Sequence, residues 1–387
     1  MKKVLSVLLV AFFAVFAFVS CTGRTYEIAL ITDVGNIDDK SFNEGAWNGV
    51  KEYAEDNDIS YAYYRPGEDS DAARIEQIEV AIDKGAKVVV CPGYLFETAI
   101  YAVQSDNPEV AFLLLDGTPH TADYSTFLTA DNTHNVLYQE EQSGFLAGYA
   151  AVMDGYRDLG YVGGMAVPAV VRFGYGYILG ADAAAAELEL AQGDVTIKYY
   201  YANAFAGSDA LETKMDGWFN NGATDVVFAC GGKLYTSVLA AAENSTNGKM
   251  IGVDVDQVAE ATSGKEVLIS SAMKGLTVSV IDSLTQFYDN DMAWPAALAG
   301  QTAVLGAAND GIGLPTVEDS WGFTTFTVAE YDALFAELVS GDVVVNAKIA
   351  WTDAEVATWV AANLTLDVED MPMYVPTVTL VEVDYEA

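Results

Sequence analysis

Short apolar runs alternate with longer amphipathic stretches along most of this chain. Runs such as VVVC and AFLLL are continuous, rich in Val, Leu and Phe, and bounded by turn residues, which is typical of strands buried on both faces of a sheet. Stretches such as 42–54 have the length and composition of helices. This order predicts parallel sheets joined by crossover helices, and the length of the chain favours two domains.

The chain contains an internal repeat. Residues 63–93 and 199–232 share the order aromatic strand, polar turn, helix, Gly-Ala, apolar strand and glycine turn, and each is followed by a strand that ends in aspartate, in AFLLLDG (111–117) and MIGVDVD (250–256). A first strand also precedes each copy, at 27–35 and at 159–165. Each half is therefore predicted to be an open, doubly wound α/β sheet.

Polar residues and glycines recur at the ends of these predicted strands. Ligands of open α/β sheets bind outside the carboxyl ends of the strands. Two sheets that face one cleft would bring five strand-end residues together, as in a hinged solute receptor: Asp33, Gly93, Asp116, Gly231 and Asp254.

The remaining segments complete two lobes. Residues 267–290 predict a strand and then a helix, and the chain is expected to return to the first half near Lys274 through one of two or three crossovers that form the hinge. The predicted N-terminal lobe comprises 26–147 plus about 275–318, and the C-terminal lobe 148–274 plus about 319–345. The extension 346–387 has no assigned role; its alternating end, VPTVTLVEVDYEA, would add or cover an edge strand.

The N-terminus has the pattern of a secretory signal. Lys2 and Lys3 precede an apolar run from Val4 to Val19, which is shorter than a bilayer-spanning helix. Residues 1–20 are predicted to be a signal peptide, Cys21 the lipidated residue, and 21–25 a tether that holds the protein on the extracytoplasmic side of the cell membrane. The alternative is a secreted protein cleaved nearby, with Cys21 a free thiol.

The charge excludes one class of function. The chain has 18 Lys and Arg against 56 Asp and Glu, a net charge of −38; removal of the two signal lysines gives 16 − 56 = −40. Nucleic-acid binding needs clustered cations to replace phosphate counterions, and the chain has no such cluster. The acidic residues are spread along the chain, which suggests a solvated shell such as a salt-adapted protein carries.

Cysteine and histidine give no support for a metal site or cofactor. Cys91 and Cys230 each end an apolar run in different halves, so buried strand positions are expected and a disulfide between them is not. His120 and His134 are the only histidines, and no CxxC or HxxxH spacing occurs. We therefore expect no metal and no cofactor.

The turn TDVGNIDDKSFN offers polar groups at the start of the first predicted helix. Asp38, Asp39 and Ser41 would either cap this helix or contact a ligand, and the sequence leaves both alternatives open. Phe42 and Phe205 would either sandwich a flat ring from opposite lobes or belong to the core.

A second pair of candidates carries opposite charge. Asp254 and Lys274 lie at separate strand ends. They would either hold adjacent hydroxyl groups of a ligand by charge-assisted hydrogen bonds or form a structural salt bridge.

Eight motifs resemble, in order, those of the basic membrane protein family of bacterial lipoproteins, whose best-understood type is the purine nucleoside receptor. They lie within about 26–345: TDVGNIDDKSFNEGAWNG, VVVCPGYLF, LLLDG, EQSGFLAGYAA, YVGGM, ACGG, GVDVDQ and SAMKG. The resemblance implies a type I periplasmic-binding-protein fold and delivery of a nucleoside to an ABC permease. One departure is Lys233-Leu234-Tyr235, which follows the glycine pair where small residues are more usual.

The resemblance also implies roles for individual residues. Phe42 and Phe205 would clamp the base, and Asn43, Asp33 and Asp116 would lie near its edge. Asp254 and Lys274 would hold the ribose hydroxyls, and Gly231 or Gly232 would allow close approach of the backbone.

The sequence therefore predicts a lipid-anchored, monomeric protein that captures a nucleoside by hinge closure and delivers it to an ABC importer. Purines are the favoured ligands. No catalytic residues and no nucleic acid partner are expected. One alternative is a nucleoside hydrolase with a DxDxGxDD calcium motif. Here Ile31 replaces the leading aspartate, and one extra residue separates Gly35 from Asp38. A ligand-sensing or adhesive surface lipoprotein is the other alternative, which the sequence does not separate from a transporter component.

Overall fold

A computed structural model describes residues 25–191, 193–221, 223–345 and 378–384. The predicted signal peptide, lipidated Cys21 and most of the 21–25 tether lie outside the described residues, as does most of the extension 346–387. Among the helices described, none is both long enough and apolar enough to span a membrane.

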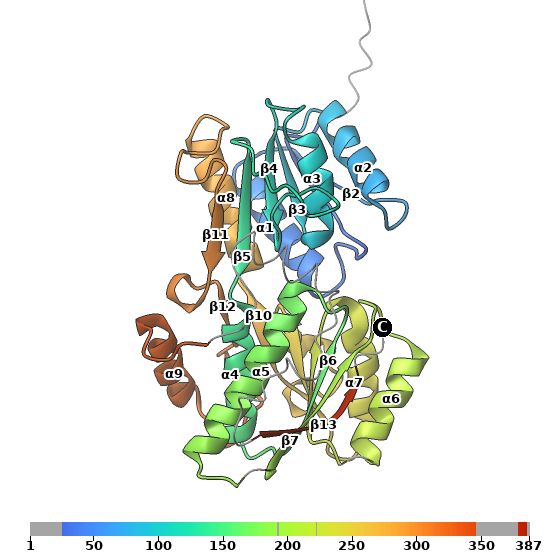
Figure 1. The fold of residues 1–387 in the computed structure, drawn as a ribbon, viewed down its shortest axis with the longest axis vertical. Helices are drawn as coiled ribbons and strands as arrows, with labels where there is room; N and C mark the ends of the chain where they lie inside the picture. Colours follow the sequence, from blue (N-terminus) through green and yellow to red (C-terminus); the bar gives the residue numbers. More distant parts are fainter. Residues whose placement is uncertain (1–24, 192, 222, 346–377, 385–387) are drawn as a thin grey trace, which may run out of the picture.

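The first lobe is built on a six-stranded parallel sheet with helices on both faces (Figure 1). Its strands, in spatial order, are β11 (Thr302–Leu305), β5 (Thr133–Tyr138), β4 (Ala111–Leu115), β3 (Val88–Pro92), β1 (Ile28–Ile31) and β2 (Tyr61–Tyr64). Its helices are α1 (Phe42–Asp56), α2 (Asp71–Asp83), α3 (Glu97–Val103) and α8 (Leu276–Asp289).

Alternation along β1 shows why this sheet needs two helical layers. Ile28 and Leu30 pack in the cluster that contains Val50 of α1, whereas Ala29 and Ile31 pack with the core under α2 and α3. Successive strand residues point to opposite faces, and all four are fully buried. The continuous apolar run thus reflects a strand covered on both sides.

The second lobe repeats this plan on a seven-stranded sheet. Its strands, in spatial order, are β12 (Ile312–Gly313), β10 (Leu268–Lys274), β9 (Lys249–Asp254), β8 (Val226–Cys230), β6 (Asp158–Gly163), β7 (Val195–Tyr201) and β13 (Val378–Asp384). Its helices are α4 (Glu140–Met153), α5 (Pro168–Glu187), α6 (Asp209–Asn220), α7 (Tyr235–Asn244) and α9 (Val328–Ser340). The prediction of two doubly wound α/β lobes is confirmed.

Two strands of this sheet come from late in the chain. The short β12 pairs antiparallel with β10. The C-terminal β13 lies parallel to β7 at the edge of the sheet. Of the two alternatives for the end of the extension, adding an edge strand or covering one, the structure shows the first. Pairing with β7 in this way removes one row of unpaired backbone groups.

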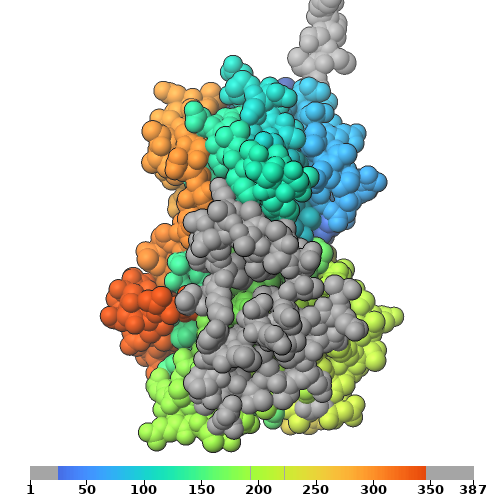
Figure 2. All heavy atoms as spheres, in the orientation of Figure 1, coloured from blue at the N-terminus to red at the C-terminus, as the bar shows by residue number. Residues whose placement is uncertain are grey.

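Between residues 25 and 345 the chain passes between the lobes three times, after β5, after β10 and after β11. Hydrogen bonds join these crossings: Gln139 N donates to Leu305 O (2.7 Å), and Gly275 N donates to Gly311 O (2.9 Å). The orange residues of α8 and β11 accordingly lie with the blue-to-teal N-terminal residues in Figure 2. The return to the first lobe near Lys274 is as predicted.

The lobe boundaries differ in two places from those expected from the sequence. Helix α4 packs on α5 and β10 of the second lobe, so the first crossing lies near Gln139 instead of residue 147. Because β12 belongs to the second sheet, the last crossing lies before Ile312 instead of near 318. Helix α4 is buried on nearly all sides, so its hydrophobic pattern did not show which lobe it covers.

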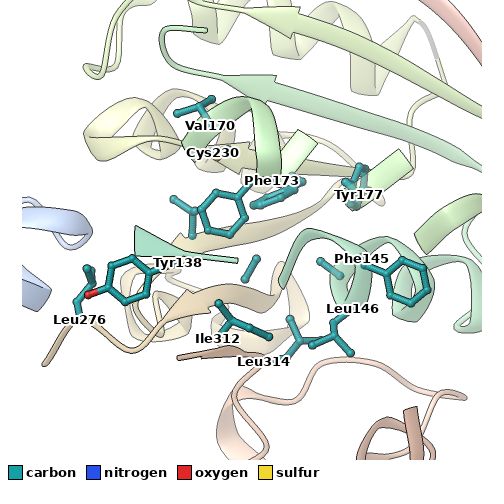
Figure 3. Close-up of a cluster of buried hydrophobic side chains, with 14 of the residues drawn as sticks. Tyr138, Phe145, Leu146, Val170, Phe173, Tyr177, Cys230, Leu276, Ile312 and Leu314 are labelled. Carbon is teal, nitrogen blue, oxygen red and sulfur yellow. The ribbon is translucent and has the colours of Figure 1, made fainter. Parts of the chain in front are cut away.

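One buried apolar cluster runs through the hinge and joins the lobes. It includes Tyr138 of β5, Phe173 of α5, Leu276 of α8 and Ile312 of β12. Figure 3 shows the part of the cluster where these elements meet. The crossings are therefore packed against core side chains and do not form an open linker.

Candidate functional site

A cavity of about 360 Å³ lies between the two lobes. All five strand-end residues that the sequence predicted to converge line it: Asp33, Gly93, Asp116, Gly231 and Asp254. The other predicted site residues line it as well: Phe42, Asn43, Phe205, Gly232 and Lys274. The parallel strands of both sheets cause this convergence, since these residues lie at the carboxyl ends of strands, in the loops that follow them or at the start of the next helix.

The first turn of α1 resolves the alternatives for Asp39 and Ser41. Asp39 caps the helix, because Oδ1 accepts from the backbone N–H groups of Ser41 (2.9 Å) and Glu44 (3.0 Å) and Oδ2 from that of Asn43 (3.1 Å). Ser41 occupies the N-cap position but makes no capping bond. Its hydroxyl instead donates to Asp254 Oδ2 in the second lobe, at 2.5 Å. Asp39 therefore has a structural role, and Ser41 joins the lobes.

Further contacts close the lobes over the mouth of the cavity. Gln257 Nε2 donates to the backbone oxygen of Lys40 at 2.6 Å. Lys233 Nζ lies 3.5 Å from Asp38 Oδ1, and both of these side chains are exposed. The structure thus represents a closed arrangement, in which Asp38 contributes to the rim.

Asn43 holds Asp33 in place. Its amide nitrogen donates to Asp33 Oδ1 and to Asp39 Oδ2, both at 2.8 Å, and its amide oxygen accepts from the Asp33 backbone N–H at 3.2 Å. Gly35 N also donates to Asp33 Oδ1 at 2.6 Å. Both N–H bonds of the Asn43 amide are thereby used, whereas no described group donates to Asp33 Oδ2, which lies beside Gly93 at the cavity.

Burial raises the pKa of Asp33 to about 6, although the hydrogen bonds from Gly35 and Asn43 oppose the shift. A carboxylate that is poorly solvated but still ionised at neutral pH is a strong acceptor for a ligand N–H or O–H group.

Lys274 occupies the centre of a buried ion network. Its ammonium group pairs with Asp116 Oδ2 of the first lobe and lies 3.0 Å from Glu140 Oε1. The other oxygen of Glu140 accepts from Arg172 Nε of α5 at 2.5 Å. The side chains of Lys274, Glu140 and Arg172 are each no more than 3% exposed, so the charges compensate one another almost without water.

Aromatic rings surround the same ammonium group. Lys274 Nζ lies 4.8 Å from the ring centre of Phe42, 5.4 Å from that of Tyr138 and 5.6 Å from that of Phe173. A cation near the face of an aromatic ring is stabilised, more strongly where water is excluded. Phe42 and Phe173 also line the cavity, so this cluster forms part of its wall.

The network perturbs the titration of its members. Burial raises the pKa of Asp116 to about 7, against the opposing effect of Lys274. For Lys274, burial lowers the pKa, but the carboxylates of Asp116 and Glu140 outweigh it and the net shift is upward. Burial likewise opposes ionisation of Glu140, yet Arg172 and Lys274 bring its pKa below the ordinary value.

Asp254 and Lys274 do not form the structural salt bridge that was one alternative. The ion pairs of Lys274 are with Asp116 and Glu140, and the hydrogen-bond donor to Asp254 is Ser41. Burial raises the pKa of Asp254, with Lys274 opposing.

Equivalent aspartates in the two lobes share an uncommon backbone conformation. Asp116 after β4 has φ of 59°, and Asp254 at the end of β9 has φ of 67°. Positive φ is uncommon for residues other than glycine, and such strain of about 1–3 kcal/mol concentrates at functional sites. The duplication therefore preserves a local conformation that aims a carboxylate at the cavity from each side.

Glycines position Phe205. Gly231 has φ of 135°, and a Cβ atom there would lie 2.8 Å from the Phe205 ring. At Gly232 a Cβ would lie 2.7 Å from the backbone oxygen of Phe205. These glycines provide space for the aromatic ring. Both also line the cavity, where the family resemblance implies close approach of the backbone to a ligand.

Several residues of the site were not predicted from the sequence. Glu140 and Arg172 support Lys274 from α4 and α5. For Arg172 the available signal was an isolated charge within a long apolar stretch, whereas Glu140 stands beside Glu141 at the start of its stretch and gave no such signal. Other cavity-lining residues that were not predicted for the site include Arg65, Tyr94 and Phe173. Lys233, noted in the sequence as a departure from the family pattern, lines the cavity as well.

Comparison with known proteins identifies relatives of this chain. The model of a family described as ABC transporter substrate-binding protein PnrA-like matches residues 27–333. The chain is 26% identical over 345 residues to a CD4+ T-cell-stimulating antigen of Listeria monocytogenes, covering 84% of this chain and 90% of that protein. It is 26% identical over 243 residues to the ABC transporter nucleoside-binding protein BmpA of Lactococcus lactis, covering 60% and 64%.

Solved structures share the fold. An ABC transporter solute-binding protein from Aeropyrum pernix superposes with a TM-score of 0.65 at 19% identity, covering 89% of this chain and 95% of that one. The arabinose-binding protein AraP from Geobacillus stearothermophilus gives a TM-score of 0.55 at 13% identity, covering 78% and 100%. The predicted type I periplasmic-binding-protein fold is thereby confirmed.

Proposed function

Since this chain belongs to the PnrA-like family of ABC transporter substrate-binding proteins, we propose that its cavity captures a nucleoside, with purines favoured, and delivers it to an ABC importer. The observation that carries this proposal is the composition of the cavity wall. Aromatic rings from both lobes, Phe42 and Phe205, line it together with acidic strand ends and one buried lysine. A nucleoside offers a matching flat base, polar edges and vicinal hydroxyl groups.

The base would stack between the two rings. Its N–H groups would donate to two carboxylate oxygens. One is Asp33 Oδ2, since the donors to Asp33 use Oδ1, and the other is the buried Asp116 Oδ1, which has no donor among the described residues. A buried acceptor without a partner is costly, so a ligand that donates to Asp116 gains affinity. Asn43 serves this subsite indirectly, because it orients Asp33.

The ribose would be held by Asp254 and Lys274 from the second lobe, as the family resemblance implies. A phosphorylated ligand is disfavoured, because more carboxylates than cations line the cavity. The carboxylates are Asp33, Asp38, Asp39, Asp116 and Asp254, and the cations are Arg65, Lys233 and Lys274.

A ligand bound to one lobe would gain contacts with the other and shift the population toward the closed form. The bond from Ser41 to Asp254 supports this closure, because it joins the first lobe to a residue of the second lobe that lines the cavity. We further propose that Cys21 carries the lipid anchor and that residues 21–25 tether the lobes to the outer face of the cell membrane. The protein would act as a monomer and present its closed form to the permease.

Specific hydrogen bonds favour this function over a calcium-dependent nucleoside hydrolase. Both oxygens of Asp39 accept from groups in the first turn of α1, and Asp33 Oδ1 accepts from Gly35 and Asn43. The carboxylates of the motif are therefore largely committed to holding the fold.

The test is calorimetric titration of the chain lacking residues 1–21 with adenosine, guanosine, inosine, cytidine, uridine and a panel of sugars, with a parallel assay for free base. Binding of a nucleoside without release of base supports the proposal and identifies the ligand. Release of base would establish the hydrolase alternative, and binding of sugars alone would show that the solute has been misassigned. An adjacent gene for a membrane kinase in place of permease genes would favour a sensor.

A further inference from the structure

The buried charges behind the cavity connect it to the hinge. Glu140 directly follows the first crossing between the lobes, and Lys274 directly precedes the second. The Lys274–Asp116 pair links the second lobe to the first, and the Glu140–Arg172 pair links the first crossing to α5. A continuous chain of ion pairs therefore runs from the first lobe, through the cavity wall and two crossings, into the second lobe.

Neighbouring hydrogen bonds tie the third crossing to the same place. Gln142 Oε1 accepts from Ala307 N at 2.8 Å, and Ser143 Oγ donates to the backbone oxygens of Met273 (3.1 Å) and Gly313 (3.3 Å). The first turn of α4, which begins with Glu140, thus contacts all three crossings.

We propose that Glu140 and Arg172 are positioning residues, which hold the Lys274 ammonium group at the cavity and secure the crossings in the closed arrangement. Neither residue lines the cavity, so both act through Lys274. The part of this inference that concerns affinity rests on the proposed function, since it requires a ligand that contacts Lys274.

The geometry supports a positioning role. The four methylene groups of lysine give its ammonium group many rotamers, and an unpaired lysine would be free to leave the cavity wall. Glu140 and Asp116 fix it from two sides, while Arg172 keeps Glu140 ionised and oriented. One oxygen of Asp116 remains without a donor, so the network leaves an acceptor available to a ligand.

The experiment compares the full-length chain with the double variant Glu140→Gln/Arg172→Met. Removing one member of a buried ion pair leaves an uncompensated charge, but removing both together is often tolerated, so the double variant is expected to fold. The control is Arg157→Met in the same lobe, because Arg157 donates to the backbone oxygens of Val152 and Tyr156 away from the cavity.

Two readouts are needed. Calorimetry with adenosine, guanosine and inosine measures affinity, and the double variant is expected to bind about tenfold more weakly, or worse, as loss of one charge-assisted hydrogen bond implies. Hydrogen exchange without ligand measures the crossings. Peptides spanning residues 138–143 and 272–276 should exchange faster in the double variant, whereas peptides from β3 and β8 should be unchanged.

The outcomes separate this inference from the proposed function. If the wild-type chain binds no nucleoside, the proposed function fails and the exchange measurement alone decides the role of the network. If the wild-type chain binds and the double variant binds equally well, Glu140 and Arg172 do not position Lys274. Unchanged hydrogen exchange at both crossing peptides would likewise overturn the inference. An affinity loss in Arg157→Met equal to that of the double variant would also overturn it, because the loss would then be a general effect of removing an arginine.

Discussion

Helices α4 and α5 of the second lobe pack backbone against backbone through reciprocal glycines. A Cβ atom on Gly148 of α4 would lie 2.1 Å from the backbone oxygen of Tyr177, and one on Gly180 of α5 would lie 1.9 Å from that of Phe145. Gly144 and Gly176 make equally close contacts with the facing helix. This packing holds the first turn of α4, and therefore Glu140, against Arg172.

We predict that Gly148→Ala destabilises the protein. An ordinary contact begins at 3.4 Å, so the helices must separate locally by about 3.4 − 2.1 = 1.3 Å. The obstacle is backbone, which cannot rotate away, so the upper end of the overpacking cost applies, about 3 kcal/mol. Alanine recovers roughly 1 kcal/mol through its higher helix propensity. The net expectation is a loss of about 2 kcal/mol in the free energy of unfolding.

The assay is urea denaturation followed by circular dichroism, with Gly217→Ala as the matched control. Gly217 lies within α6, and nothing stands within 4 Å of its added Cβ atom. This control should stabilise the protein by roughly 0.5–1 kcal/mol, because only the propensity changes. If both variants shift the midpoint in the same direction, the close approach of α4 and α5 does not determine stability, and the reasoning is refuted.

Three further predictions follow from the site and the surface. Phe42→Ala and Asp254→Ala should each weaken nucleoside binding at least about tenfold in calorimetry while leaving the far-ultraviolet circular dichroism unchanged. Tyr63→Ala, at a residue that is 45% exposed, should leave binding unchanged. Unchanged affinity in both site variants would remove the site assignment. Burial raises the pKa of Glu141 from 4.5 to about 8, with Arg172 opposing. Between pH 4.5 and 8 the folded state therefore keeps a proton that the unfolded state loses. Over this range the free energy of unfolding, compared with that of Glu141→Gln, should fall by up to about 1.4 kcal/mol per pH unit. If the free energies of unfolding of the two proteins change in parallel with pH, this prediction is wrong. The net charge of −38 predicts that the melting temperature rises as sodium chloride is increased from about 0.1 to 1 M, because the Debye length falls from about 10 to 3 Å. A constant or falling melting temperature would show that repulsion among the acidic residues is unimportant for stability.

The repeated strand ends were readable in the sequence because a parallel sheet fixes where each strand terminates. Continuous apolar runs identified the strands, and duplication placed Asp116 and Asp254 at equivalent positions. All nine predicted ligand-binding residues consequently line one cavity. The resemblance to a family added the assignment of individual residues, which composition and periodicity alone do not provide.

Side-chain partners were not readable in the same way. The sequence left capping of α1 and contact with a ligand open for Asp38, Asp39 and Ser41. The structure shows Asp39 as the cap and Ser41 bonded to the other lobe. Lys274 was considered with Asp254, yet its ion pairs are with Asp116 and Glu140. Each choice depends on which groups lie within about 3 Å after folding, and sequence spacing does not encode that distance.

The sequence by itself determined the two-lobed α/β plan, the strand ends that meet at the cleft and the types of residue that line it. The reason is that strands buried on two faces appear as continuous apolar runs, and the chain direction then fixes which end of each run lies at the cleft. Only the tertiary structure decided that α4 belongs to the second lobe, that glycines let it approach α5, and that Glu140 and Arg172 stand behind Lys274. These features arise from contacts between segments distant in the chain, and the sequence does not specify which of those segments come into contact.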